Sequence, residues 1–302
     1  MVLEQSPTVR KLRLGIELRR LRLRAGRSMP EAADHVARTD SSISRMETGQ
    51  VAVSERVLDK LCELYDARSE EREALRILAA EARQRGWWHA YGDSLLPGFD
   101  VHLGLEAEAG THWIYEPEVV PGLLQTEGYM RELIWAEPRP LPDKVTNDLL
   151  AVRRRRQERL TGQDAPALWV VLHEGVLRHD VGGTATMRAQ LEHLLSMSRQ
   201  SNVTLQVLPF SAGAHPAMRT GGFTVLSIPI GGDVTYDVVY LEHRTGGLHL
   251  DRPADVGGQL AVHDRLRAKA LSREDSRTLV ERLARGTAPG EGADRRPGGT
   301  GA

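Results

Sequence analysis

The sequence lacks the features that define several protein classes. Its 302 residues include one cysteine, Cys62, so an internal disulfide is excluded and a thiolate metal site would lack ligands. No stretch approaches the roughly 18 to 20 consecutive apolar residues of a membrane span, and charged residues stand where a secretory signal would be apolar. We therefore expect a cytoplasmic globular protein without a membrane partner.

Motifs of catalysis are also missing. The sequence contains no Walker loop, no GxSxG nucleophile motif, no dinucleotide-binding fingerprint and no cluster of metal ligands. His173, Glu174 and His179 do not have the HExxH spacing that brings two histidines to one helical face, so we expect structural roles for them. An enzyme is therefore the least favoured class, and we expect no metal and no cofactor.

Length and charge distribution predict two domains with different partners. A chain of 302 residues with 40% hydrophobic and 27% charged residues is typical of a two-domain globular protein. The net charge is −1, yet residues 8–60 contain twelve Arg or Lys against seven Asp or Glu. This basic segment predicts an anionic partner, although charge alone does not distinguish nucleic acid from a membrane surface.

Five short helices are predicted for residues 8–85, which we expect to form an α-helical domain. The first has leucines at helical spacing and ends near Gly26. The fifth carries Arg83 and Arg85 in its expected last turn, where cations suit the helix dipole. The second to fifth helices begin at hydroxyl side chains of the type that starts helices, which are Ser28, Thr39, Ser54 and Ser69.

Residues 28–49 have the pattern of a helix-turn-helix. Ala33 in the first of two short helices allows close approach of the second, whose Ile43 and Met46 face it. The opposite face of the second helix is then exposed, so its hydroxyls can contact phosphates or bases and its arginine can pair with guanine. The expected DNA-binding residues are Ser28, Thr39, Asp40, Ser41, Ser42, Ser44 and Arg45.

Charged residues in this region leave two alternatives open. Asp40 would repel phosphate, so it either caps the helix or accepts a hydrogen bond from a cytosine amino group. The arginines between Arg19 and Arg24 alone favour a solvated helix face, whereas the adjoining helix-turn-helix favours contact with DNA. Arg45 is the long donor on the exposed face and is our first candidate for reading a base.

Three features of these segments, LGIELRRLRLRAG in the first helix, Ala33 and the run 39–49 ending in ISRMETG, resemble the Xre/Cro-type helix-turn-helix regulators. The resemblance implies a lambda-repressor-like fold and a sequence-specific contact with double-stranded operator DNA. The family often has glutamine, glycine and a hydrophobic residue where Met29, Ala37 and Arg38 stand here.

A mixed α/β domain is predicted for residues 105–285. A helix between the first two β-type runs creates the strand-helix-strand pattern of an α/β core. We expect a linker at 86–104 and a disordered tail at 286–302, which consists mainly of Gly, Pro and charged residues. The predicted strands are 168–172, 203–208, 223–228 and 234–241, and the predicted helices are 126–135, 143–160, 186–200, 254–269 and 273–285.

Landmarks spread over this second region carry another resemblance. They are EPEVVPGLLQTEGYM (116–130), VRRRRQERL (152–160), HEGVLRHDVGG (173–183), VTLQVLPFSAGAHP (203–216), GGFTVL (221–226) and VVYLEHRTGG (238–247). They are similar to the C-terminal domain of uncharacterised function in actinobacterial antitoxin-like regulators, the Scr and WhiJ-like proteins. In that group a gene for a very small protein is a common neighbour, so the resemblance implies a small protein partner.

The second region contains two candidate sites for a partner or ligand. Arg153 and Arg156 belong to a charge run on an amphipathic helix, where an exposed face or partner surface is favoured over a phosphate clamp. The loop 211–216, with Gly213 and His215, follows a strand. It could equally shape a ligand pocket or form a tight turn.

The sequence therefore predicts an antitoxin-like transcriptional regulator whose C-terminal domain dimerises and receives a signal from a small protein partner. A homodimer is expected because one helix-turn-helix reads only a short half-site. Two alternatives remain open. One is an interaction module in which the helix-turn-helix serves mainly assembly, and the other is a regulator that senses a small ligand.

Overall fold

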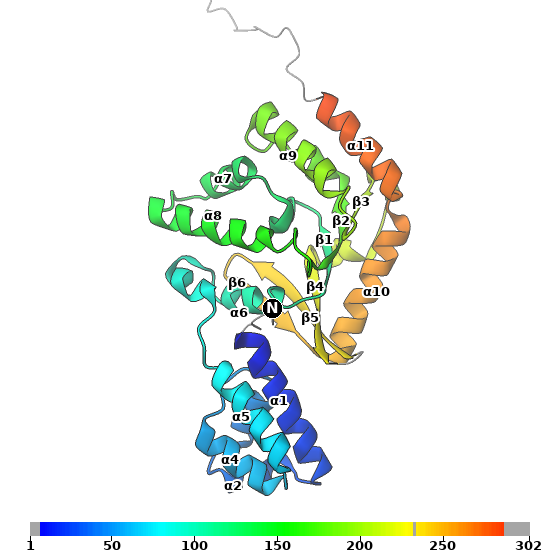
Figure 1. The fold of residues 1–302 in the computed structure, drawn as a ribbon. Coiled ribbons are helices and arrows are strands. Elements are labelled where there is room, and N and C mark those ends of the chain that lie inside the picture. Colours follow the sequence, from blue (N-terminus) through cyan, green and yellow to red (C-terminus); the bar gives the residue numbers. More distant parts are fainter. Residues whose placement is uncertain (1–6, 232–233, 287–302) are drawn as a thin grey trace, which may run out of the picture. The chain divides into compact units, whose positions relative to one another are not determined.

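The computed structural model describes residues 7–231 and 234–286 (Figure 1). These residues form two compact units. Among the described residues, the first combines 7–110 with 226–231 and 234–251, and the second combines Thr111–Val225 with 252–286. A segment late in the sequence therefore packs in the same unit as the N-terminal helices.

The N-terminal region is helical, as predicted. Ser28 and Thr39 cap their helices by accepting hydrogen bonds from the backbone, whereas Ser54 makes no side-chain cap bond. The fifth helix stops at Glu81, so Arg83 and Arg85 lie beyond its last turn, because the backbone continues in tight i to i+3 turns there. The helices are α1 (Pro7–Arg24), α2 (Met29–His35), α3 (Asp40–Glu47), α4 (Glu55–Leu64) and α5 (Ser69–Glu81).

A single apolar core holds these five helices together. The leucines of α1 contact the alanines of α2, the inward side of α3 and the apolar positions of α4. Cys62 lies in this core with no exposed surface, as expected for a small buried hydrophobe. Its fully buried members with the largest side chains include Leu14, Leu18, Leu21, Ile43, Leu58, Leu61 and Tyr65.

The segment 86–104, expected as a linker, contains folded elements. It includes the 3-10 helix η1 (Trp87–Ser94) and most of α6 (Phe99–Glu106). The indole of Trp88 is 3% exposed, and its ring lies against Gly86 so closely that a side chain there would collide with it. The aromatic residues of this segment therefore pack in the first unit.

Six strands form one mixed sheet in the order β3-β2-β1-β4-β5-β6 among the described residues. β1, β2 and β3 run parallel, and β5 and β6 run antiparallel. The four predicted strands are confirmed, while β1 and β6 were not predicted from the sequence. The strands are β1 (Thr111–Glu116), β2 (Ala167–His173), β3 (Val203–Leu208), β4 (Phe223–Gly231), β5 (Val234–His243) and β6 (Gly246–Leu250).

The parallel strands β1–β3 have two different faces. One is aliphatic and packs in a common core with residues of α9 and α11, which lie side by side (Figure 1). On the other, the rings of Trp113 and Trp169 stack at 5.6 Å, and His263 of α10 meets Trp113 edge-on at 5.5 Å. Helices thus cover both faces, as is typical of parallel strands.

The helices of the second unit agree with the predicted ranges to within a few residues. They are α7 (Glu127–Trp135), α8 (Asp143–Glu158), α9 (Gly183–Met197), α10 (Pro253–Lys269) and α11 (Arg273–Gly286), with short 3-10 turns η2 (Gly122–Leu124), η3 (Glu174–Leu177), η4 (Phe210–Ala212) and η5 (Pro216–Arg219). Within the described ranges, no helix has the length and hydrophobicity of a membrane span. Beyond Gly286, the tail predicted to be disordered lies outside the described residues.

Candidate DNA-binding surface

Helices α2 and α3 are joined by a tight turn with one left-handed residue. Ala37 has a φ of 53°, a conformation that glycine adopts more readily than alanine. The amide of Arg38 then donates to the carbonyl of Ala33 at 2.9 Å and closes the turn. Ala33 is buried against the core, which allows α3 to pack closely on α2. This geometry is that of a helix-turn-helix.

Ser28 is held in a capping box at the start of α2. Its hydroxyl accepts from the amide of Glu31 at 3.3 Å, and the Glu31 carboxylate accepts from the Ser28 amide at 2.8 Å. The hydrogen bonds from Ser28 lower the pKa of Glu31. The Glu31 carboxylate therefore already accepts a hydrogen bond from a backbone N–H group at the start of α2. Its negative charge also reduces the attraction of this helix end for a phosphate.

Thr39 caps the recognition helix α3. Its hydroxyl accepts from the amide of Ser42 at 3.3 Å and lies 2.9 Å from the hydroxyl of Ser41. Asp40 is the first residue of the helix, fully in its first turn and exposed to solvent. The capping position that the sequence left open for Asp40 is therefore taken by Thr39, and the aspartate complements the helix dipole.

The outer face of α3 carries the residues expected to meet DNA. Ser41 and Arg45 are exposed, and Ser42 and Ser44 are half-buried. The Nε atom of Arg45 makes one long bond, 3.4 Å, to the carbonyl oxygen of Ser41. Its guanidinium therefore has donors available for a base or phosphate, because five N–H groups are present on the fork.

A buried ion pair fixes the C-terminal end of α3 to α1. The guanidinium of Arg22 donates from Nε and Nη2 to the two carboxylate oxygens of Glu47 at 2.6 and 2.9 Å. Both side chains are nearly inaccessible, and Arg22 also donates to the carbonyl of Arg27 in the turn before α2. This pair was not predicted from the sequence. Its only signal is that Glu47 and Arg22 fall beside core positions of their helices.

Gly15 adds a second attachment between α1 and α3. A Cβ atom at this position would lie 2.5 Å from the carbonyl oxygens of Met46 and Glu47, so only glycine allows this approach. The backbone of α1 therefore lies directly on the end of the recognition helix. Together with the ion pair, this contact orients α3 from behind its exposed face.

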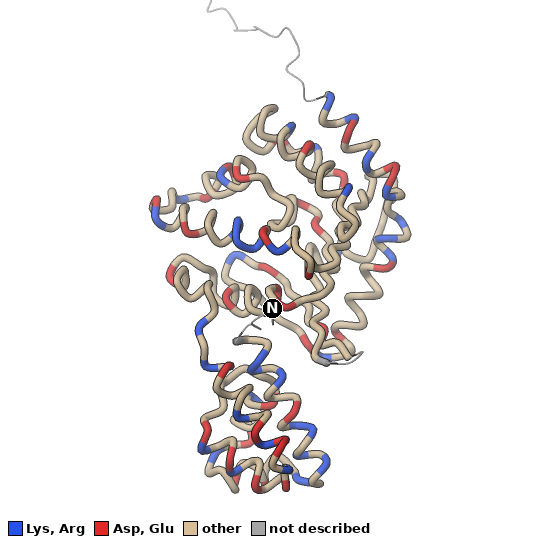
Figure 2. Tube along the Cα trace, viewed as in Figure 1, with Lys and Arg blue, Asp and Glu red and all other residues tan. Residues whose placement is uncertain are grey.

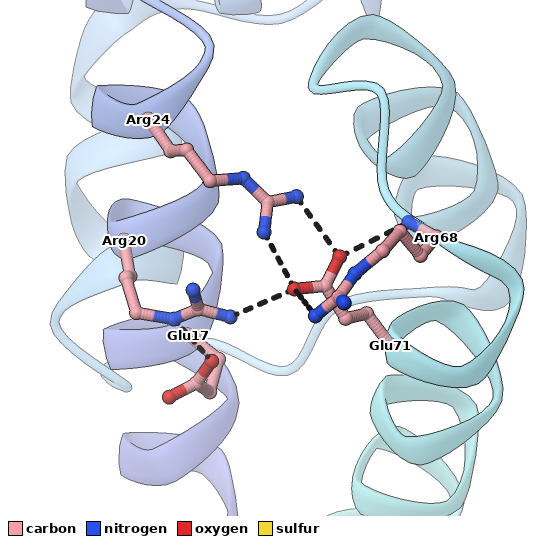
Figure 3. Close-up of polar contacts among 5 residues, drawn as sticks. All are labelled: Glu17, Arg20, Arg24, Arg68 and Glu71. Atoms are coloured by element: carbon pink, nitrogen blue, oxygen red, sulfur yellow. Dashed lines mark hydrogen bonds and ion pairs between the residues drawn. The ribbon is translucent and has the colours of Figure 1, made fainter.

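The arginines at the C-terminal end of α1 are engaged within the protein. Figure 3 shows Arg20, Arg24 and Arg68 converging on the carboxylate of Glu71 in α5. Arg24 binds it through two nitrogens at 2.6 and 2.9 Å, and Arg20 also pairs with Glu17 at 2.8 Å. Figure 2 shows acidic residues interspersed with basic ones over the five helices, and the ion pairs with Glu17, Glu47 and Glu71 neutralise part of the basic charge counted in the sequence.

Comparison with known families agrees with this architecture. Residues 13–75 match a family described as a helix-turn-helix domain, and residues 99–282 match the family described as domain of unknown function DUF5753. The second match covers more than half of the chain. The chain belongs to the DUF5753 family. No curated protein and no solved structure matches it.

The helix-turn-helix match indicates a DNA-binding regulator, with the DUF5753 domain as its C-terminal part. The matched domain starts at the first residue of α6. Its boundaries differ from those of the compact units, because α6 and the segment Leu226–Asp251 pack in the unit that contains the helix-turn-helix. The family therefore does not correspond to one separate compact body.

In the DUF5753 domain, the loop with Gly213 and His215 follows the carboxyl end of β3. Gly213 has a φ of +64° and a ψ of −148°, a conformation restricted largely to glycine. Lys269 of α10 donates to the carbonyls of Ala212 and Ala214 at 3.1 and 2.8 Å. These contacts hold the loop as an ordered turn.

His215 belongs to this turn and packs on aromatic residues of β1 and β2. Its ring meets Tyr115 edge-on at 5.8 Å and lies 6.3 Å from the ring of His173. Burial, the neighbouring His173 and the cation of Lys269 lower the pKa of His215. Phe210 and Met218, which flank this loop, are 57% and 64% exposed and provide apolar surface on either side of it.

Arg153 and Arg156 of the DUF5753 domain are half-buried on α8. The Arg153 side chain lies directly over Gly122, where a Cβ atom would overlap it. Next to it, the side-chain Nε2 of Gln157 donates to the backbone carbonyls of Gly122 and Gln125 at 3.1 and 2.7 Å. This face of α8 thus holds the η2 turn in place.

The histidines considered for metal binding have other contacts. His173 accepts from the amide of Gly175 at 3.2 Å, and Glu174 accepts from Arg178 and from the amide of Phe210. Glu174 is nearly buried, and the bond from Phe210 together with the Arg178 cation keeps its pKa low against the effect of burial. Among the residues that the structure describes, no group of His, Cys, Asp and Glu is arranged to hold a metal.

Proposed function

We propose that this protein is a sequence-specific regulator of transcription that binds double-stranded operator DNA through α3. The observation that carries the proposal is the exposed Arg45 beside Ser41, on a helix whose opposite side is clamped by Arg22 and Gly15. A recognition helix needs this combination of free donors outside and fixed orientation inside, because base readout depends on angle as well as distance.

Titration of the full chain with a duplex from the region upstream of its own gene tests the proposal. Phosphate contacts release counterions, so the affinity should fall steeply as the salt concentration rises. Scrambled duplex of the same length serves as the control and should bind more weakly at moderate salt. Failure to bind the upstream duplex even at low salt would refute the proposal.

The resemblance to antitoxin-like regulators supports two finer proposals, a homodimer and a small protein partner encoded nearby. Half-site recognition supports the dimer. The exposed Phe210 and Met218 provide apolar surface of the kind that partners bury. Sedimentation velocity of the full chain at micromolar concentration tests the dimer, and co-purification with the product of the neighbouring small gene tests the partner. A monomer, or no complex, would contradict the respective proposal.

One observation favours a second candidate function, an interaction module without DNA binding. Glu31 and Asp40 place carboxylates at the starts of α2 and α3, where a phosphate backbone would otherwise be attracted. The salt titration distinguishes the two candidates, because an interaction module would bind neither duplex. We also place the protein in the cytoplasm without catalytic activity or cofactor, on the basis of the missing motifs.

A further inference from the structure

Helix α1 belongs to two different apolar cores. Near its start, Val9 is fully buried in a cluster with residues of α6 and the segment after it, β4 and β5, which are Leu105, Ala109, Leu226, Ile228 and Val238. From Leu14 onward, the same helix contributes its leucines to the helix-turn-helix core. Figure 1 shows α1 as one continuous helix between these two regions of the first unit.

The N-terminal part of α1 is attached to the DUF5753 elements at two points. A Cβ atom on Gly104 of α6 would lie 2.2 Å from the hydroxyl oxygen of Thr8, so the two helices touch without room for a methyl group. One turn further on, Nη2 of Arg13 donates to the carbonyl of Pro229 in β4 at 2.7 Å. Neither contact is local in sequence.

The other part of α1 is attached to the recognition helix through Gly15 and Arg22. Because a helix rises about 1.5 Å per residue, the contact at Thr8 and the ion pair at Arg22 are separated by roughly 21 Å along one helix. The helix ends cannot move independently when both are packed at the density of a protein interior. A displacement of α6 or β4 therefore acts on the end of α3.

We infer that α1 couples the surface of α6 and β4–β6 to the DNA-binding face of α3. The inference rests on the proposed DNA binding and adds a route of regulation to it. Because coupling between two sites is reciprocal, DNA bound at α3 must alter the α6 and β4–β6 region, and a molecule that shifts this region must alter DNA affinity.

Hydrogen exchange of the full chain, with and without the upstream duplex, measures the coupling without a known effector. Duplex should slow exchange in α3 directly. It should also change the exchange rates in α6 and in β5–β6 by at least about fivefold, the lower end of typical couplings between sites. Both regions lie far from the exposed face of α3 in sequence, so separate peptides report them.

Gly104→Ala forces α1 away from α6 and should remove the remote change while α3 remains protected. Gly92→Ala is the matched control, because a Cβ atom there meets nothing within 4 Å. The double variant Thr8→Gly with Gly104→Ala removes the Thr8 side chain that the new methyl group would meet. The close contact of α1 with α6, and part of the remote change, should then return. If circular dichroism shows that Gly104→Ala is unfolded, Arg13→Gln replaces it with the same expectation.

The outcomes separate this inference from the proposed function. Absence of α3 protection in the natural protein would refute DNA binding, and the coupling would fall with it. Protection of α3 without any change in α6 and β5–β6 would overturn the coupling alone. A remote change that persists in both Gly104→Ala and Arg13→Gln would equally show that α1 does not transmit it.

Discussion

Helices α1 and α3 both carry arginine, but their arginines have different partners. On α1, Arg20 and Arg24 bind Glu71, and Arg22 is buried with Glu47. On α3, Arg45 makes one long bond to the backbone and is exposed. The comparison shows that the more basic helix mainly stabilises the domain, whereas the helix with one available guanidinium can recognise a ligand.

The buried pair should produce the largest effect. Glu47→Gln leaves the Arg22 guanidinium buried without its counter-charge, so the free energy of unfolding should fall by about 3 to 5 kcal/mol in urea denaturation. Glu63→Gln, at an exposed position of α4, is the matched control and should change little. Replacement of both partners, Arg22→Met with Glu47→Leu, should recover part of the loss. Equal stability of the two Gln variants would contradict the assigned role.

Arg45→Ala should have the next largest effect, on binding and not on folding. Loss of a two-bond contact with guanine should weaken operator binding by about 1 to 3 kcal/mol and relax the preference at one base pair. Arg83→Ala removes the same charge beyond the end of α5 and should leave the ranking of operator variants unchanged. An unchanged ranking in Arg45→Ala as well would show that this residue reads no base.

Features governed by local sequence were predictable from the chain. The caps Ser28 and Thr39, the turn at Ala37 and the buried side of α3 follow from residue types within a few positions of each other. The strands 203–208 and 223–228 were predicted because their runs are rich in β-branched or aromatic residues and are bounded by turn residues. The exposed positions of Ser41 and Arg45 were also predictable, because Ile43 and Met46 occupy the opposite face of the same helix.

Features governed by distant contacts were not predictable. β6 contains two glycines and was missed, because its strand conformation depends on pairing with β5. Glu47, which pairs with Arg22, and Glu71, which binds Arg20, lie 25 and 51 residues away from these arginines, and no local pattern connects them. The packing of Leu226–Asp251 with the N-terminal helices was likewise not predictable, because the segment 86–104 has the composition of a linker between two domains.

The exposed cluster around Glu71 should have the smallest effect and a distinct pH dependence. Hydrogen bonds from Arg24, then from Arg68, hold the pKa of Glu71 far below its ordinary value of 4.5. A lowered pKa in the folded state means that the carboxylate stabilises the fold above pH 4.5, and that this stabilisation is lost as the pH falls toward the lowered value. Glu71→Gln should therefore melt at a lower temperature than the natural protein at pH 6, by less than Glu47→Gln. The difference should shrink as the pH decreases from 4.5 to 3, because Glu71 then takes up a proton in the unfolded chain while it stays ionised in the folded protein. Thermal unfolding at several pH values measures this difference, with Glu70→Gln, an exposed neighbour in the same helix turn, as the control. A difference that stays constant across this pH range would show that the shape of the side chain, and not its charge, holds α1 against α5.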